Sequence, residues 1–167
     1  MGVSIEPVAP AHFEGLWRAL DVVAREKRYL AFTEAPAWES SRAFYEHIVA
    51  NDLCQVVAVL DDEVVGWCDI LPGVGQTRAH VGTLGIGLVP AARQQGIGAR
   101  LMRAAIDGAW ARGLTRIELS VRADNANAQA LYKRLGFEPE GVRRRSVRVD
   151  GQYHDSLAMA LLRDEGA

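Results

Sequence analysis

Strand-like and helix-like hydrophobic patterns alternate along the whole chain, in an order that leaves few folds open. Apolar residues at every second position predict strands, and apolar residues three and four apart predict helices. The predicted strands are Val3–Val8, Cys54–Leu60, Glu63–Leu71, His80–Val89, Thr115–Val121, Phe137–Arg148 and Tyr153–Leu162. The predicted helices are Pro10–Arg25, Glu39–Val49, Ile97–Arg112 and Ala126–Leu135. This order predicts an α/β (α+β) protein with a mixed sheet and helices on both faces.

The length and the charge of the chain narrow its class further. Its 167 residues fit one domain. The formal net charge of −2 gives little attraction for a phosphate backbone or an anionic membrane, so we expect no nucleic-acid partner. No apolar run approaches the roughly 18 residues of a membrane-spanning helix, and no signal peptide is evident at the N-terminus. We therefore expect a cytoplasmic protein with no membrane association.

The two cysteines, Cys54 and Cys68, each lie in an apolar segment predicted to be a strand. One interpretation is a disulfide or a reactive thiol. The other, which we favour, is a pair of buried, reduced cysteines in neighbouring strands. Because no paired histidines accompany them, the sequence predicts no metal site.

A glycine-containing segment joins the predicted strand His80–Val89 to the predicted helix Ile97–Arg112. It contains the pattern Arg-x-x-Gly-x-Gly, from Arg93 to Gly98. Glycines allow a tight turn, and the first amides of a helix can bind an anion such as a diphosphate. The alternative is a tight turn with no ligand. The segment is not a P-loop, since no Gly-Lys-Ser/Thr follows, and Leu101 stands where a dinucleotide fingerprint requires glycine.

A second polar segment precedes the predicted helix Ala126–Leu135. Asp124 or Asn125 can cap this helix. Tyr132 lies at the edge of the helix's apolar face, as either a core tyrosine with its hydroxyl toward water or a phenol held beside a reacting group.

Together these two segments resemble the GNAT superfamily of N-acetyltransferases, in which Arg-x-x-Gly-x-Gly is followed about thirty residues later by Asn-x6-Tyr-x3-Gly-Phe. The chain looks most similar to the small-amine, amino-acid and ribosomal-protein acetyltransferase branches. The resemblance implies one N-acetyltransferase domain over residues 1–167. It also implies a mixed seven-stranded sheet that splays between strands 4 and 5, here His80–Val89 and Thr115–Val121, to admit the pantetheine arm of the cofactor.

The resemblance implies acetyl-CoA as cofactor, with coenzyme A as product, and assigns residues to it by position. Backbone groups of Leu88 and Val89 would bind pantetheine, and Asn125 would contact the same arm. Lys133 is a candidate for the adenosine 3′-phosphate, or else part of a solvated helix face. The residues expected at the diphosphate are Arg93, Gln94, Gln95, Gly96, Ile97, Gly98 and Ala99.

The resemblance makes Tyr132 the expected proton donor to sulfur, but it leaves the base open. Family members carry a glutamate at the position of Gly82 or of Ser120, and both are missing here. His80 lies two residues before Gly82 on the same face of the strand, so it is our candidate catalytic base. The alternative for His80 is a histidine at a strand end, satisfied by a neighbour or by water. Glu118 is a second candidate, with a charge-paired surface role as its alternative, and Glu34 is a third.

The resemblance places the acceptor site between the first two helices and the final hairpin. Tyr29, Phe32 and Glu34 are the expected substrate-binding residues, and Glu34 is also suited to hold a substrate ammonium group. The arginines in Gly141–His154 could bind a substrate carboxylate or form a solvated hairpin. We expect an N-acetyltransferase acting on a small-molecule amine or amino acid. By analogy with other family members, we expect a homodimer. The alternatives are a protein N-terminal or peptide acetyltransferase and a non-catalytic acyl-CoA-binding regulatory module.

Overall fold

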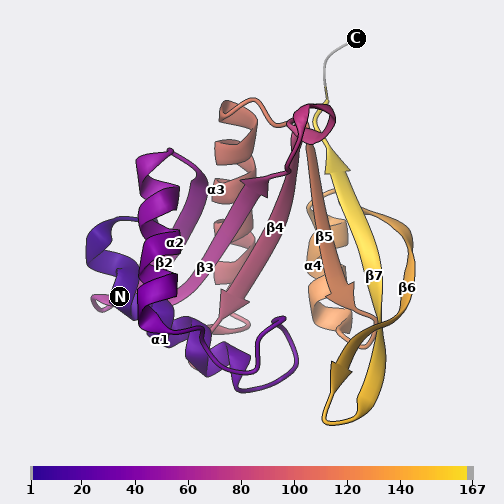
Figure 1. The fold of residues 1–167 in the computed structure, drawn as a ribbon, viewed down its shortest axis with the longest axis horizontal. Coiled ribbons are helices and arrows are strands. Elements are labelled where there is room, and N and C mark those ends of the chain that lie inside the picture. Colours follow the sequence, from indigo (N-terminus) through magenta and orange to yellow (C-terminus); the bar gives the residue numbers. More distant parts are fainter. Residues whose placement is uncertain (1, 165–167) are drawn as a thin grey trace.

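The computed structural model describes residues 2–164, which form one seven-stranded mixed sheet with four α-helices (Figure 1). The strands lie in the order β1-β2-β3-β4-β5-β7-β6. The strands are β1 (Ser4–Pro7), β2 (Cys54–Leu60), β3 (Glu63–Pro72), β4 (Val81–Leu88), β5 (Arg116–Arg122), β6 (Glu138–Val149) and β7 (Gln152–Leu162). The helices are α1 (Phe13–Ala24), α2 (Trp38–Ala50), α3 (Ile97–Ala111) and α4 (Ala126–Arg134). This confirms the predicted mixed sheet, and most predicted boundaries agree with the observed ones within two residues.

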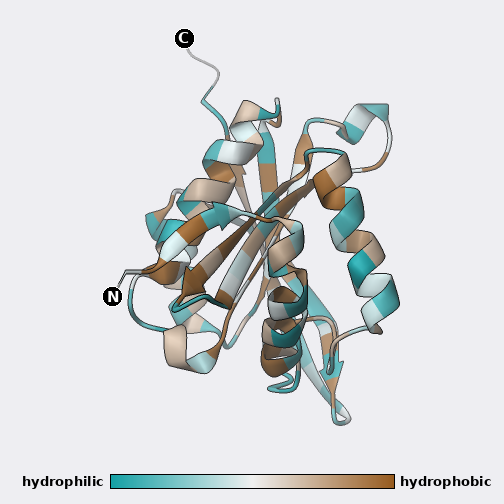
Figure 2. Cartoon of the chain, turned by 90° about the vertical axis from the view of Figure 1, so that its left-hand side faces the viewer, coloured by the Kyte–Doolittle hydropathy of each residue, from teal (hydrophilic) through white to brown (hydrophobic). Residues whose placement is uncertain are grey.

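Two hydrophobic cores lie on opposite faces of the sheet. On one face α1 and α2 pack against the sheet through residues such as Leu16, Ile48 and Trp67. On the other face α3 covers the sheet, with Leu101 and Met102 fully buried. Hydrophobic residues accordingly gather on the central strands and on the helix surfaces that face them (Figure 2). The chain therefore has the three-layer arrangement that the sequence predicted.

The β2–β3 hairpin confirms two local predictions. Asp61 and Asp62 both have positive φ, 51° and 64°, as the two central residues of a type I′ hairpin turn do. Cys54 and Cys68 are buried and free in these neighbouring strands, so the prediction of reduced, buried cysteines holds. The hairpin brings both thiols into the core under α3.

The first predicted helix is divided in two. Pro10–His12 forms a turn of 3-10 helix, and α1 begins only at Phe13. Within residues 2–164, no helix has the length and hydrophobicity that crossing a bilayer requires.

The central feature of the sheet is the parallel contact between β4 and β5. These strands pair only where Val81–Thr83 lies beside Arg116–Glu118. Beyond that short contact they diverge, and Figure 1 shows β4 and β5 side by side at one end and separated at the other. This confirms the splayed sheet that the family resemblance implied.

Gly82 lies in the closed part of this contact, where a side chain has no space. A Cβ atom there would lie 2.5 Å from Ile70 Cγ2 and 2.7 Å from Leu114 Cδ1. We predict that Gly82→Ala lowers the free energy of unfolding by about 1–3 kcal/mol, because it overpacks the core. The matched control on the same strand is Gly85→Ala, whose Cβ would meet its nearest heavy atom at 3.3 Å. Denaturant unfolding of both variants checks this, and an equal loss in the two would contradict it.

Candidate active site

A cavity of about 630 Å³ opens where β4 and β5 diverge. Its walls come from the open end of β4, the end of β5, the start of α4 and the loop after α1. This volume lies in the range of small-molecule and cofactor sites. The splay of the sheet therefore forms a candidate binding site of a size suited to a cofactor.

The N-terminus of α3 lies at the mouth of this cavity. Gly96 caps the helix in a left-handed conformation (φ 79°), and Gln94 just before it is also left-handed (φ 61°). No heavy atom lies within 4 Å of where a Gly96 Cβ would stand, so this turn is open. Gln94 and Gly98 line the cavity, whereas Gln95, Gly96, Ile97 and Ala99 belong to the same turn without lining it. The free amides of the first helical turn can therefore bind an anion at this mouth.

Arg93 connects the end of α1 to the end of β4. Its guanidinium donates hydrogen bonds to both carboxylate oxygens of Glu26, at 3.0 and 2.9 Å, and to the carbonyl oxygen of Leu88. It also lies over the ring of Tyr29, with 4.8 Å between Cζ and the ring centroid. Since Glu26 already balances its charge, Arg93 holds the rim of the cavity, and the amides that follow it are the freer anion donors.

Backbone alternation decides which β4 groups face the gap. The carbonyl of His80 accepts from Thr115 on the β5 side, whereas the amide of Val89 donates to Val65 on the β3 side. Even-numbered residues of β4 therefore direct their backbone groups toward β5. Leu88 has its backbone groups on the gap side, but Val89 has its amide bonded to β3 and its carbonyl bonded to the Ala92 amide.

Asn125 and Lys133, both expected at the cofactor, lie in different environments. Asn125 caps α4, with its Oδ1 accepting a hydrogen bond from the Ala128 amide at 3.2 Å, and it also lines the cavity. Lys133 is exposed and does not line the cavity. The structure therefore brings Asn125, but not Lys133, to the predicted site.

Tyr132 is buried on α4 and lines the same cavity, 7% exposed. Its ring packs against Phe137 at a centroid distance of 6.1 Å. Burial raises the pKa of the Tyr132 hydroxyl well above its ordinary value, and the nearby Cys68 adds to this. The phenol is therefore protonated at neutral pH and faces the space between the diverging strands, as a proton donor must.

The structure does not bring His80 to this cavity. His80 is exposed and precedes the closed end of β4, while the cavity lies at the open end. Strand alternation does not show which end of a strand opens, so the sequence could not exclude His80 from the site. Gly82, the position at which the family resemblance implied a glutamate in other members, is closely packed, so any side chain there would require Ile70 and Leu114 to shift.

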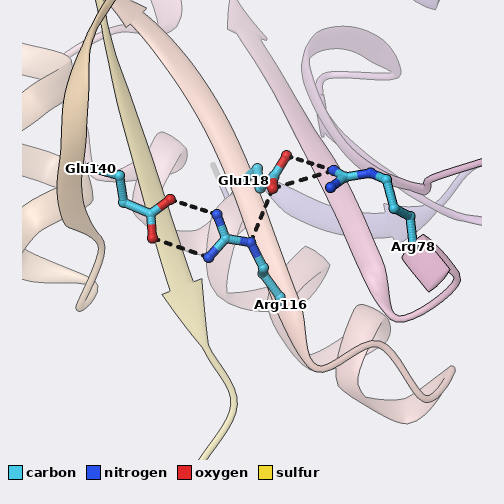
Figure 3. Close-up of polar contacts among 4 residues, drawn as sticks. All are labelled: Arg78, Arg116, Glu118 and Glu140. Atoms are coloured by element: carbon cyan, nitrogen blue, oxygen red, sulfur yellow. Dashed lines mark hydrogen bonds and ion pairs between the residues drawn. The ribbon is translucent and has the colours of Figure 1, made fainter.

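Glu118 has the charge-paired role. It accepts hydrogen bonds from Arg116 and Arg78, and Arg116 extends the network to Glu140 (Figure 3). Partial burial acts to raise the pKa of the Glu118 carboxyl, but the hydrogen bonds from the two arginines outweigh it, so the pKa lies below its ordinary value. A carboxylate held ionised between two arginines is a poor proton acceptor.

The three predicted substrate residues are separated from one another. Tyr29 lines the large cavity, and Phe32 lines a second pocket between α1, α2 and the sheet. Glu34 lines neither pocket and is exposed, with an ion pair to Arg25 at 3.5 Å.

The second pocket contains two polar side chains that the sequence reasoning missed, Asp69 of β3 and Gln55 of β2. The pocket has a volume of about 310 Å³ and is otherwise lined largely by apolar and aromatic residues. The Gln55 amide nitrogen donates to Asp69 Oδ2 at 3.1 Å. Burial raises the pKa of Asp69 to about 6, although the hydrogen bond from Gln55 acts to lower it. A signal existed in the sequence, because each residue is a polar side chain inside an otherwise apolar strand.

Comparisons with known proteins place this geometry in a family. The model of the Acetyltransferase (GNAT) family matches residues 17–137. The L-amino acid N-acetyltransferase AaaT of Escherichia coli is 38% identical over 108 residues, which is 64% of this chain and 66% of that protein. The N-alpha-acetyltransferase RimI of Mycobacterium tuberculosis is 44% identical over 81 residues, 48% of this chain and 47% of that protein. The chain thus spans about two thirds and about half of these two relatives' own lengths.

A solved structure of similar fold contains the cofactor. The phosphinothricin acetyltransferase of Sinorhizobium meliloti, in complex with acetyl-CoA, superimposes with a TM-score of 0.90 at 20% identity, over 99% of this chain and 91% of that one. The fold, the site geometry and the family match agree with one another. This chain belongs to the GNAT family of acetyltransferases, enzymes that use acetyl-CoA.

Proposed function

We propose that this chain transfers an acetyl group from acetyl-CoA to the primary amine of a small molecule or amino acid. The observation that carries this proposal is the large cavity between β4 and β5, because it brings a helix N-terminus and a buried tyrosine to one space. The first suits the diphosphate of the cofactor, and the second suits its sulfur. In this proposal residues 1–167 act as one N-acetyltransferase domain.

The residues at the cavity fit the cofactor. The open turn at Gly96 leaves space for phosphate oxygens, and the amides that follow it lack helical partners. The backbone groups of Ile86 and the amide of Leu88 face the gap and would bind the pantetheine amides, whereas the Leu88 carbonyl already accepts from Arg93. The side-chain amide of Asn125, whose oxygen caps α4, keeps N–H donors for the same arm.

The chemistry requires one proton donor and one proton acceptor. When bound, acetyl-CoA supplies an activated acetyl group as a thioester. Burial keeps the Tyr132 hydroxyl protonated at Oη, so it holds a proton that it would donate to the departing sulfur. Gap-facing N–H groups of β4 would stabilise the oxyanion that forms when the amine attacks. An alkyl ammonium with a pKa of about 10.4 costs about 4–5 kcal/mol to deprotonate at pH 7, so a base is also needed.

The names of the two relatives support an amine acceptor, but they indicate acceptors of different size. AaaT is named for L-amino acids and RimI for N-alpha-acetylation. A peptide acceptor is therefore the second candidate. Thiol release from acetyl-CoA, measured across amines, amino acids and peptides, separates the two. No release with any acceptor, despite measured coenzyme A binding, would instead favour a non-catalytic regulatory module.

The turn before α3 is the proposed phosphate site, so an anion introduced there should prevent coenzyme A from binding. We predict that Gly96→Glu abolishes coenzyme A binding in calorimetry, because it places an anion in the phosphate site. The matched control is Gly151→Glu in the β6–β7 turn, where the glycine has the same φ of 79° and the same open surroundings. Both variants place a side chain on a residue with the same left-handed φ, so equal binding losses in the two would contradict the placement.

The role of the Tyr132 hydroxyl gives a second prediction. Tyr132→Phe removes a proton donor and keeps the ring packing against Phe137, so we expect turnover to fall about a hundredfold or more. The dissociation constant of coenzyme A should change little. Steady-state kinetics and calorimetry on the same preparation check this, and undiminished turnover would remove Tyr132 from the mechanism.

A further inference from the structure

We infer that the pocket between α1, α2 and the sheet binds the ammonium group of the acceptor, with Gln55 holding it and Asp69 accepting its proton. This inference rests on the proposed function and adds to it a base and an acceptor class. The acceptor would be a primary amine that carries an apolar or aromatic group. In this inference the catalytic base is a carboxylate of β3, rather than a carboxylate of β4 or β5.

The pocket presents hydrogen-bond acceptors with no cation to match them. Asp69 opens into it, and Gln55, 4% exposed, directs its Nε2 to Asp69. The Gln55 Oε1 atom is buried and has no hydrogen-bond partner among the described residues. No lysine, arginine or histidine of the described chain lines the pocket. Buried acceptors are normally satisfied, so this pair fits a ligand with several N–H donors and a positive charge.

The fold aligns Gln55 with Asp69 through an irregularity in the β2–β3 hairpin. From the turn, Leu60 pairs with Glu63 and Val59 with Val64, a register that would set Gln55 opposite Cys68. A bulge between Ala58 and Val59 shifts the register by one residue and sets Gln55 opposite Asp69. Bulges often re-aim side chains next to active sites.

The same pocket adjoins the open part of β4. Asp69 pairs with Gly85 on β4, and its Oδ1 lies 3.3 Å from where a Gly85 Cβ would stand. Trp67 lies over Gly87 in the same way. Gly85 is two residues beyond the last β4 residue paired with β5 and two before Gly87, which lines the large cavity. Asp69 therefore lies one strand away from the gap, on the α1–α2 side of the sheet, and only the side-chain-free Gly85 stands opposite it on β4.

The remaining lining selects the rest of the acceptor. Apolar and aromatic side chains from α1, α2, the loop between them and β3 surround Gln55 and Asp69: Leu16, Leu20, Phe32, Phe44 and Trp67. Phe32, expected at the substrate from the sequence, belongs to this group. The hydroxyl-bearing residues Ser40, Ser41 and Tyr45 of α2 also line the pocket. The apolar walls favour an aromatic or branched apolar group next to the amine.

The proton and electron balance is complete with these residues. An N–H bond of the ammonium breaks, its proton goes to Asp69, and the electron pair stays on nitrogen. A C–N bond then forms at the acetyl carbon as the C–S bond breaks and its electrons leave with sulfur. Tyr132 gives its proton to the sulfur and is reprotonated by the second proton that the nitrogen loses. The first proton leaves Asp69 for the solvent.

Among Asp69 and the titratable groups that interact with it, only Asp69 has a pKa near neutral pH. Its titratable neighbours are Tyr45 of α2 and the buried thiols Cys54 and Cys68. Burial, with a smaller effect of the Asp69 charge, raises the pKa of Tyr45 to about 12, and burial raises the pKa of both thiols. Gly85 of β4 and the α1 residues of the pocket do not titrate.

The test begins with Asp69→Asn, compared with Glu34→Gln and His80→Gln as controls. Because the base must be ionised, wild-type kcat/KM for 2-phenylethylamine should fall as the pH drops through about 6. Asp69→Asn should lower kcat/KM by about 10²–10⁴-fold and lose that pH limb. Both controls should keep it. Coenzyme A binding should be unchanged in all three.

Thermal unfolding shows whether Asp69→Asn is folded. Folding raises the Asp69 pKa from 3.8 to about 6, so the folded state is destabilised as the pH rises through that interval. At neutral pH the amide escapes this cost, and Tm should rise or stay level.

A binding measurement gives a readout that does not depend on turnover. Calorimetry with coenzyme A present should show wild type binding 2-phenylethylamine and discriminating against 2-phenylethanol, a neutral analogue of similar shape. Gln55→Met and Asp69→Asn should both reduce this preference. Equal binding of amine and alcohol by wild type would overturn the inference.

The outcomes separate the inference from the function on which it rests. If wild type acetylates amines and Asp69→Asn keeps both rate and pH profile, this inference fails and the proposed function stands. If wild type acetylates no amine, the proposed function fails and the inference fails with it.

Discussion

The short pairing between β4 and β5 is the constraint on which the rest of the structure depends. It joins the two halves of the sheet over Val81–Thr83 and Arg116–Glu118 and then ends. The N–H and C=O groups of a central strand are left facing a gap, and such groups cost free energy unless something polar pairs with them. The pantetheine arm of acetyl-CoA carries amides of matching kind. In our proposal, the pantetheine amides satisfy the backbone groups that the opening of the sheet leaves without partners.

The two sides of the gap provide different groups, one side fitting the cofactor and the other carrying the second pocket. The α3 N-terminus, Asn125 and Tyr132 come from the side that follows β4 in the sequence, and they fit a phosphate-bearing thioester. Asp69 and the apolar and aromatic pocket residues of α1, α2 and the loop between them come from the side that precedes β4. The Arg93–Glu26 pair joins the end of α1 to the turn after β4, so it ties the two sides together at the rim.

Much of this was predictable from the sequence because the determining interactions are local. Hydrophobic periodicity gave strands such as Cys54–Leu60 with their observed bounds, and the Asp61-Asp62 turn identified the hairpin. The cap of α4 could be narrowed to two residues, and Asn125 is the one that accepts the amide. The splay itself came from the family resemblance, because strand separation depends on contacts between segments far apart in the chain.

The acceptor side could not be predicted, because it depends on register and direction. Strand alternation placed His80 on a face of β4 without showing that this end is closed. Gln55 lies opposite Asp69 only because of a β-bulge, and no local sequence pattern predicted that bulge. The charge of Asp69 in an apolar strand was visible, but its partner was not.

Amide hydrogen exchange with and without coenzyme A tests the central claim most directly. If the gap receives the pantetheine arm and the α3 turn holds the diphosphate, coenzyme A should slow exchange at Ile86, Leu88 and the first amides of α3. Amides of β1 and β2, far from the gap in the sheet order, should be unaffected. Bound coenzyme A that leaves exchange at β4 and the α3 turn unchanged would contradict the account.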